Sequence, residues 1–417
     1  MIPFSFFLIA YLTLFICSSV GELALDLVND RHVKKYGNNV PSVFNGLIDG
    51  EKLSQINAYN SDLTKVTLVK TIISKSVFLL IILSGILPWF AEILKDFHFI
   101  PAGLIFFAIL GLGGAFVDLP FDYYHTFFIE ERYGFNETTL KIWISDLIKS
   151  LLIAVILGTV LLSALLLMIR YAGNTWWIWA WAIFFSFQLL MTVLYPTVIA
   201  PLFNKFSAIE NPELLEKIEE LAEREGLTIK GIFQMDEGRR TRHTNAYFTG
   251  LGKVKRIVLY DTLLAAHNED EILAILAHEI GHLKRGHIKK QLIMISVVSI
   301  MIFYVASKMI TWETMYRSFG FSWMPVYVGL FLVSVLWEPV TFFLSPISMA
   351  ISRRFEYDAD RYASRLLTST KPFIDALKKL ARDNLSNLRP HPIYVKFTYS
   401  HPPLLERIEK LEELGDG

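Results

Sequence analysis

The residues best suited to chemistry in this chain are two histidines and a glutamate in one short segment, HEIGH, at positions 278–282. On a helix, positions i and i+4 share a face, so the imidazoles of His278 and His282 can bind one zinc ion. Glu279 then lies beside the metal and can take a proton from the metal's water. The alternative is a solvated helical face that carries two histidines by chance. We interpret the pattern as the zinc site of a hydrolase.

A catalytic zinc site needs a third protein ligand, because it uses three and keeps its fourth position open. His287 follows His282 by five residues, whereas the metzincin pattern places its third histidine six residues on, so we reject it. Glu356 fits better, because Glu356 and Asp360 are i and i+4 in a second helix-compatible segment. We predict Glu356 as the third ligand and Asp360 as a hydrogen-bonding partner of a ligand or a reacting group. A solvated acidic face would give the same spacing.

Composition limits the class of protein that can carry this site. Hydrophobic residues make up 53% of the 417 residues and charged residues only 19%, which indicates a membrane protein with a substantial polar part. Lys+Arg and Asp+Glu both number 40, so the net charge is zero and a general nucleic-acid binder is excluded. The single cysteine, Cys17, excludes a disulfide framework and a cysteine-based zinc cluster.

Seven weakly charged, apolar runs are candidates for membrane-spanning helices, which need about 20 apolar residues each. They cover residues 1–21, 76–94, 99–117, 150–169, 171–204, 291–307 and 318–337, the last continuing toward residue 352. Spans six and seven form a hairpin, so the polar segments on either side of it lie on one side of the membrane. The loops on that side hold eight basic residues near the membrane and the opposite loops hold four. The N-terminus is therefore predicted outside and the polar domain in the cytosol.

The polar domain is predicted to contain short strands and two amphipathic helices. Strands are expected at residues 229–235, 246–249 and 256–260, with capped helices beginning after Asn211 and at Asn268. The strand that starts near Asn245 could be a sheet edge that pairs with an extended substrate, although an ordinary sheet strand would read the same. His401 precedes a further helix and, taken alone, reads as a surface histidine.

Several longer segments carry a family resemblance. They are VDLPFDYYHTFFIEERYGFNETTL from Val117, IAPLFNKF from Ile199, TNAYFTG from Thr244, KRIVLYDTLL from Lys255, SRRFEYDAD from Ser352 and YSHPPLLER from Tyr399, together with HEIGH. Through them the chain resembles, over nearly its whole length, the CAAX prenyl protease 1 family, the integral-membrane gluzincins that include the yeast a-factor-converting enzyme.

This resemblance implies a mainly α fold, a seven-transmembrane-helix barrel enclosing an intramembrane chamber, with a gluzincin-type α+β zinc metalloprotease domain. It assigns residues 1–204 to spans one to five, 205–290 and 353–417 to the two parts of the protease domain, and 291–352 to spans six and seven. It also implies a role for each site residue. One Zn²⁺ is bound by His278, His282 and Glu356; Glu279, Asp360 and His401 are catalytic; Asn245, Ala246, Tyr247 and Arg407 hold the substrate.

Two departures from the eukaryotic members suggest a prokaryotic protein. The chain lacks their long charged insertion between Leu264 and Glu271, and it ends without a basic retrieval signal. We therefore expect a multi-pass protein of the inner membrane, whereas a eukaryotic member would belong to the endoplasmic reticulum. The expected substrate is a prenylated CAAX-type peptide or another hydrophobic, membrane-associated peptide, handled by a monomer.

Three other functions stay open at this point. A membrane quality-control protease without prenyl specificity would carry the same residues, and an enzyme acting on something other than peptides is disfavoured only by the candidate edge strand. A transporter or receptor with a structural metal could use the intramembrane acids Glu92 and Glu338. A structural zinc site, however, would have four protein ligands, and the sequence offers three.

Overall fold

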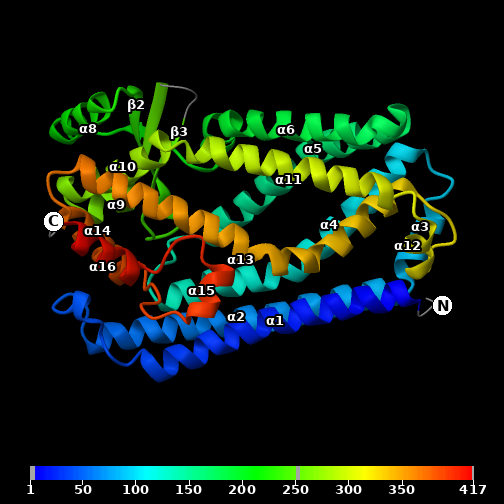
Figure 1. The fold of residues 1–417 in the computed structure, drawn as a ribbon, viewed down its shortest axis with the longest axis horizontal. Helices are drawn as coiled ribbons and strands as arrows, with labels where there is room; N and C mark the ends of the chain where they lie inside the picture. The colour runs from blue at the N-terminus through cyan, green and yellow to red at the C-terminus, as the bar shows by residue number, and fades with distance from the viewer. Residues whose placement is uncertain (1–4, 250–253, 416–417) are drawn as a thin grey trace.

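The structure, a computed structural model, describes residues 5–249 and 254–415. Long helices run side by side along the molecule and a smaller polar domain lies at one end, far from the N-terminus (Figure 1). Within the described residues, seven helical stretches are long and apolar enough to cross a membrane. They are Phe6–Tyr36 (α1), Gly50–Leu83 (α2), Phe99–Glu130 (α4, Phe99–Tyr124, and η2, His125–Glu130), Leu140–Tyr171 (α5), Gly173–Phe203 (η3, Gly173–Thr175; α6, Trp176–Leu194; η4, Tyr195–Ile199; α7, Ala200–Phe203), His287–Met309 (α11) and Val326–Leu366 (α13).

Shorter elements connect these helices and build the polar domain. Near the membrane they are η1 (Ser42–Phe44), α3 (Ile86–Ile93) and α12 (Glu313–Ser318). The polar domain contains β1 (Phe206–Ala208), α8 (Pro212–Arg224), β2 (Thr228–Met235), η5 (Glu237–Arg239), β3 (Ala246–Thr249), β4 (Val254–Tyr260), α9 (Asp261–Ala266), α10 (Glu269–Lys284), α14 (Lys371–Asp383), α15 (Pro392–Thr398) and α16 (Leu404–Gly415).

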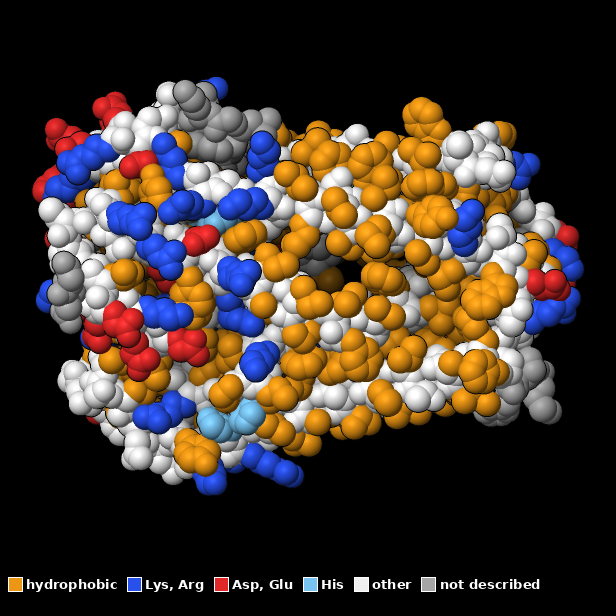
Figure 2. All heavy atoms as spheres, viewed as in Figure 1, with side chains coloured by type: hydrophobic (Ala, Val, Ile, Leu, Met, Phe, Trp, Pro, Cys, Tyr) orange, Lys and Arg blue, Asp and Glu red, His pale blue; other side chains and the backbone are white. Residues whose placement is uncertain are grey.

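The membrane helices carry many apolar side chains that the rest of the protein does not cover. The most hydrophobic windows of α5 and of the stretch through α6 are 6% and 0% buried, so their side chains require a lipid environment or line a cavity. Hydrophobic side chains cover the part of the surface formed by the long helices, and charged side chains gather at the end that holds the polar domain (Figure 2). An opening in the apolar surface leads inward (Figure 2), and a cavity of about 770 Å³ lies between α2, α3, α4 and α13.

The seven predicted spans are present, but two of them begin and end elsewhere. The run at 76–94 is not one helix, because α2 ends at Leu83 and Gly85 turns the chain in a left-handed conformation before α3. The run from Ser318 is also interrupted, since α13 starts only after Pro325. Residues 1–4 of the first predicted span lie outside the described residues. The fifth stretch, Gly173–Phe203, lies within its predicted run, and the remaining helices extend beyond the uncharged runs that revealed them.

The polar domain contains a four-stranded sheet in the order β1-β2-β4-β3. Strands β2 and β4 pair in parallel, and β3 pairs antiparallel with β4, with Ala246 opposite Leu259. The buried residues Ile257 and Leu259 belong to the core that this sheet shares with α10 and α14. The three predicted strands are confirmed, and β3 is an edge of the sheet. Both predicted helix starts are confirmed too, with Asn211 and Asn268 as their N-caps.

The helices α10 and α13 pack closely enough that only a glycine fits between them. A Cβ atom added at Gly281 would lie 2.9 Å from the carbonyl oxygen of Ala359 and 3.1 Å from the Cβ of Tyr362. The close approach brings the HEIGH face of α10 to the last turns of α13. Gly286, with φ of +66°, separates α10 from α11, so the HEIGH helix does not run straight into the sixth span.

Candidate metal centre and active site

Three side chains from α10 and α13 converge on one point, and they are the predicted metal ligands. The Nε2 atoms of His278 and His282 are 3.1 Å apart, and each lies 3.4 Å from a carboxylate oxygen of Glu356. One ligand atom from each residue lies within 4.8 Å of the others. Two imidazoles and a carboxylate in this arrangement can share one divalent cation.

The polar atoms of this cluster fit a metal ion better than they fit one another. His278 and Glu356 are buried, and the Glu356 Oε2 atom has no hydrogen-bond partner among the described residues. A buried carboxylate oxygen left in this state costs free energy unless something binds it. Two histidines and one glutamate form the ligand set of catalytic zinc sites that keep a fourth position open.

Asp360 supports the cluster from behind. Its Oδ1 atom lies 2.8 Å from Nδ1 of His278, the ring nitrogen that faces away from the cluster. Arg407 of α16 donates two hydrogen bonds to the same carboxylate, at 2.9 Å from Nε and 2.6 Å from Nη2. Although burial opposes the charge of Arg407, Asp360 holds the pKa of the guanidinium above its usual range. The pair fixes the orientation of the His278 ring.

The protonation of the histidines and of Glu279 suits metal binding and proton transfer. Burial lowers the pKa of His278, but the neighbouring carboxylates of Asp360 and Glu356 outweigh it and raise that pKa to about 9. Burial and the neighbouring His278 lower the pKa of His282 to about 4. A proton held between His278 and Glu356 is therefore one that a metal ion would displace. Burial also raises the pKa of Glu279, which makes its carboxylate a stronger base.

His287 lies next to the cluster without joining it. Its Nδ1 atom is 3.0 Å from Nδ1 of His282, on the side of that ring that faces away from Glu356. Its ring stacks on Phe355 with the centroids 4.4 Å apart. The sequence considers His287 only as a rejected ligand, whereas the structure places it against the outer nitrogen of His282.

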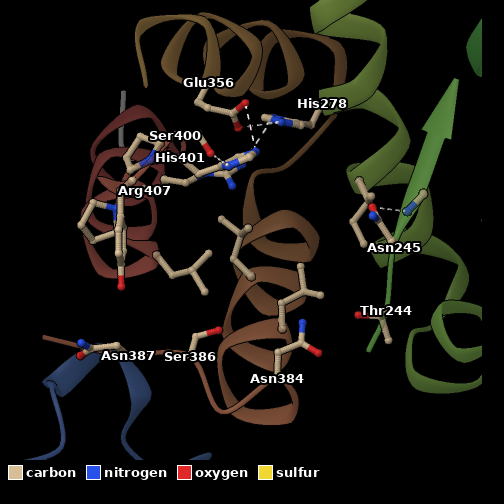
Figure 3. Close-up of a pocket in the computed structure, with 18 of the residues that line it drawn as sticks. Thr244, Asn245, His278, Glu356, Asn384, Ser386, Asn387, Ser400, His401 and Arg407 are labelled. Carbon is tan, nitrogen blue, oxygen red and sulfur yellow. Dashed lines mark hydrogen bonds and ion pairs between the residues drawn. The ribbon is translucent and has the colours of Figure 1, made fainter. Parts of the chain in front are cut away.

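A cleft of about 720 Å³ opens in front of the cluster (Figure 3). Glu279 lines it, as do Asn245 and Ala246 from the start of β3, and Arg407. His401, from the loop before α16, has a side chain that is 65% exposed, and its Nε2 atom lies 3.4 Å from Glu356 Oε1. Of the residues assigned to catalysis or substrate, Glu279, Asn245, Ala246, His401 and Arg407 thus meet at one cleft.

Tyr247 faces elsewhere. It lines a second cavity of about 880 Å³, bounded by β3, by α6 with the turns that follow it and by the start of α11. His282 lines both cavities. The three predicted metal ligands therefore lie between a polar cleft and a cavity that reaches the membrane helices.

Sequence reasoning missed the residues that close the cleft on its other sides. Asn384, Ser386 and Asn387 follow α14 and face the cleft (Figure 3), and Tyr59 and Asn60 of α2 reach it from the membrane part. No motif or spacing marks these residues, because only the tertiary fold brings α2 and the end of α14 to the metal. Thr244 was noted only as part of a longer matching segment.

The long apolar helices and the His–His–Glu cluster with its adjacent Glu279 define an integral-membrane metallopeptidase. Two sequence profiles match the chain: the CAAX prenyl protease N-terminal region of five membrane helices over residues 29–205, and peptidase family M48 over residues 208–415. A CAAX prenyl protease 1 homolog of Arabidopsis thaliana is 36% identical over 383 residues, which cover 89% of this chain and 90% of the relative. CAAX prenyl protease 1 of Saccharomyces cerevisiae is 37% identical over 75% of this chain and 72% of its own length.

The fold has a solved counterpart. A crystal structure of S. mikatae Ste24p superposes with a TM-score of 0.92 at 31% identity, covering 98% of this chain and 100% of that one. The chain belongs to the CAAX prenyl protease 1 family, within peptidase family M48, and is an integral-membrane metalloendopeptidase. This class excludes the alternative of a transporter or receptor with a structural metal.

Proposed function

We propose that this protein uses zinc to hydrolyse peptide bonds in lipidated, CAAX-type peptides at the membrane surface. The observation that carries the proposal is the position of β3, an edge strand whose first residue, Ala246, lines the cleft in front of the ligand cluster together with the preceding Thr244 and Asn245. An edge strand offers unpaired backbone N–H and C=O groups to an extended peptide. The zinc ligands would be His278, His282 and Glu356.

Zinc held by these residues would supply Lewis-acid chemistry, which polarises a substrate carbonyl and acidifies a water molecule. Glu279 accepts a proton, because burial raises its basicity, and returns that proton to the leaving amine. His401 lies near Glu356 on the open side of the cleft, where it can donate a hydrogen bond to the developing oxyanion. Asp360 and Arg407 hold the His278 ring, and Arg407 also faces the cleft.

The substrate backbone is proposed to lie along β3. Asn245 presents its side chain at the cleft end of the strand, where its Oδ1 accepts the N–H of Ala246 at 2.8 Å. The Thr244 hydroxyl is buried, lines the cleft and has no hydrogen-bond partner among the described residues. Such a hydroxyl suits a peptide group that arrives with the substrate.

The lipid is proposed to occupy the second cavity, on the Tyr247 side of β3. Most of its lining is apolar, including Leu189, Ile288 and Leu292 from the membrane helices, and His282 places it beside the metal. The apolar space of about 770 Å³ between α2, α3 and α4 is a poorer candidate. Its residue Glu338 precedes Glu356 by 18 positions on α13, which corresponds to about 27 Å of helix.

The proposed orientation puts the N-terminus outside and the protease domain in the cytosol. In support, the N-terminus lies at the end of the helices opposite the polar domain, as an odd number of spans requires (Figure 1). Basic side chains gather where the apolar surface meets the polar domain (Figure 2), as the distribution of Lys and Arg near membranes predicts. One chain supplies every group of the site, so we propose a monomer.

The test is to incubate the purified protein with a farnesylated CAAX peptide and with the same peptide unlipidated, and to read the products by mass spectrometry. We expect zinc-dependent cleavage of the farnesylated peptide, lost with a chelator and restored by added zinc. Equal cleavage of both peptides would support a hydrophobic-peptide or quality-control protease instead. Cleavage of neither would contradict the proposal.

A further inference from the structure

The segment at residues 117–140, which the proposed chemistry does not use, carries a buried carboxylate into the protease domain. Glu130 is only 8% exposed and ends the helical stretch that began at Phe99. The hydroxyl of Tyr59 in α2 donates to Glu130 Oε1 at 2.7 Å. The Nε2 atom of His243 lies 3.2 Å from Glu130 Oε2. A membrane helix thus meets the chain just before β3.

Local structure explains why Glu130 points this way. Pro120 lies inside α4 and lacks a backbone N–H, and the turn that follows, His125–Glu130 (η2), is a π-helix. A π-turn holds one more residue than an α-turn and so rotates the side chains that follow it. After Glu130 the chain joins the protease domain directly. Asn136 forms a β-bridge with Thr241, and the N–H of Arg242 donates to the carbonyl of Phe135 at 3.1 Å.

Several neighbours hold the side chain of His243, which is 36% exposed. Its Nδ1 atom lies 3.0 Å from Asn384 Oδ1, its ring stacks on Phe135 with the centroids 4.3 Å apart, and the Thr262 hydroxyl donates to its carbonyl at 2.9 Å. Both ring nitrogens therefore face acceptor oxygens, an arrangement that only the doubly protonated imidazolium satisfies fully. Its partner Glu130 also faces the ring of His125, with Nε2 at 3.6 Å, and the Tyr59 hydroxyl.

The hydrogen bond between His243 and Asn384 joins two walls of the substrate cleft, and Glu130 holds the opposite side of the His243 ring. His243 directly precedes Thr244 and Asn245 on one wall, and its partner Asn384 lies on the opposite wall (Figure 3). We propose that the ion pair between Glu130 and protonated His243 positions the start of β3 against the α14 wall for peptide binding. Both are positioning residues that act through β3, and neither is catalytic. The inference rests on the proposed function, in which peptide binds along β3.

The proposal has a consequence for pH dependence. Burial opposes the charge on His243, but its bonds to Glu130 and Asn384 outweigh it, and the pKa of His243 is raised. The ion pair is therefore complete below the ordinary histidine pKa of about 6.5 and is lost as the pH rises through the raised value. Peptide affinity is expected to weaken over that interval.

The test compares Glu130→Gln with Glu131→Gln, the same substitution at the neighbouring exposed residue. We expect Glu130→Gln to raise KM for the farnesylated peptide about tenfold, the scale of one charged hydrogen bond. The kcat should stay within about twofold, since no transition-state contact is removed. The rise of wild-type KM with pH should disappear in Glu130→Gln and remain in Glu131→Gln. Tyr59→Phe should give a smaller increase in KM.

An unchanged KM in Glu130→Gln, or a fall in kcat alone, would overturn the inference. The proposed function would stay intact in that case, provided that the wild type cleaves the farnesylated peptide. Absence of hydrolysis in the wild type would instead defeat the proposed function. Hydrogen exchange gives a readout that needs no activity and no variant. In the wild type, the amides of Ala246–Thr249 should exchange faster, relative to the amides of α8, as the pH rises and His243 loses its proton. A ratio of exchange rates between β3 and α8 that stays constant would also overturn the inference.

Discussion

Replacing Asp360 with asparagine tests whether the metal site depends on support from behind the ligands. The substitution keeps the size of the side chain and removes its charge. Asp360 is 4% exposed and bonds His278 Nδ1 at 2.8 Å and Arg407 at 2.6 and 2.9 Å. The amide can still accept from one of these groups, but it no longer balances the buried guanidinium.

Two losses follow from these contacts. Removing a carboxylate that orients a metal-binding histidine typically weakens metal affinity about 10–100-fold, which corresponds to about 1.4–2.8 kcal/mol. Leaving the buried Arg407 without its counter-charge costs about 3–5 kcal/mol of folding free energy. In the apo protein only the second loss applies. When zinc is present, weaker binding also reduces the stabilisation that the metal gives to the folded state, so the two losses add.

The assay is a zinc competition titration against a chromogenic chelator, paired with thermal unfolding of the apo and zinc-loaded protein in detergent. Asp358→Asn is the matched control, since Asp358 is 41% exposed on the same helix and pairs only loosely with Arg361 at 3.6 Å. We expect the control to match the wild type in both measurements. Wild-type zinc affinity in Asp360→Asn would refute the role assigned to the contact with His278.

Three further outcomes are expected. Glu356→Ala should lose stoichiometric zinc, whereas His287→Ala should retain it at saturating metal, and metal analysis showing the reverse would mean that the wrong third ligand was chosen. Gly281→Ala should cost about 1–3 kcal/mol of unfolding free energy through overpacking and should weaken zinc binding, because its Cβ would push α10 from α13; wild-type values in unfolding and zinc titrations would contradict the close-packing argument. In a cysteine-free background, a cysteine near Asn174 should react with an impermeant thiol reagent on intact cells and one near Asn211 only after lysis; labelling near Asn211 in intact cells would invert the topology.

Much of the site follows from spacing alone, because helical periodicity converts sequence distance into a shared face. The i and i+4 spacing predicts that His278 and His282 converge, and the hairpin of the last two spans predicts that Glu356 returns to meet them. Both are seen in the structure. The sequence does not distinguish an edge strand from an interior strand at residues 246–249, and only the strand order of the folded sheet decides between them.

Other features depend on tertiary contacts that no local pattern reveals. The uncharged run places the second span too late in the chain, at 76–94, because the run begins only after Lys75, yet Lys75 belongs to α2 and is paired with Glu22 and Glu338. A charged residue in a membrane helix looks unfavourable when that helix is considered alone, although a residue of opposite charge on another helix pairs with it. The roles of Tyr59 and Asn384 cannot be predicted from local sequence either, because they arise from contacts with residues far away in the chain.

The most direct test of the central claim is the activity and the zinc content of Glu279→Gln, measured on the same preparation. Glu279 lies in the cleft but outside the ligand cluster, so the variant should bind about one zinc per chain, as the wild type does. Its hydrolysis of a farnesylated CAAX peptide should fall by about 10²–10⁴-fold, the usual contribution of a general base. Substantial turnover by the zinc-loaded variant would contradict the assignment of Glu279 and the mechanism built on it.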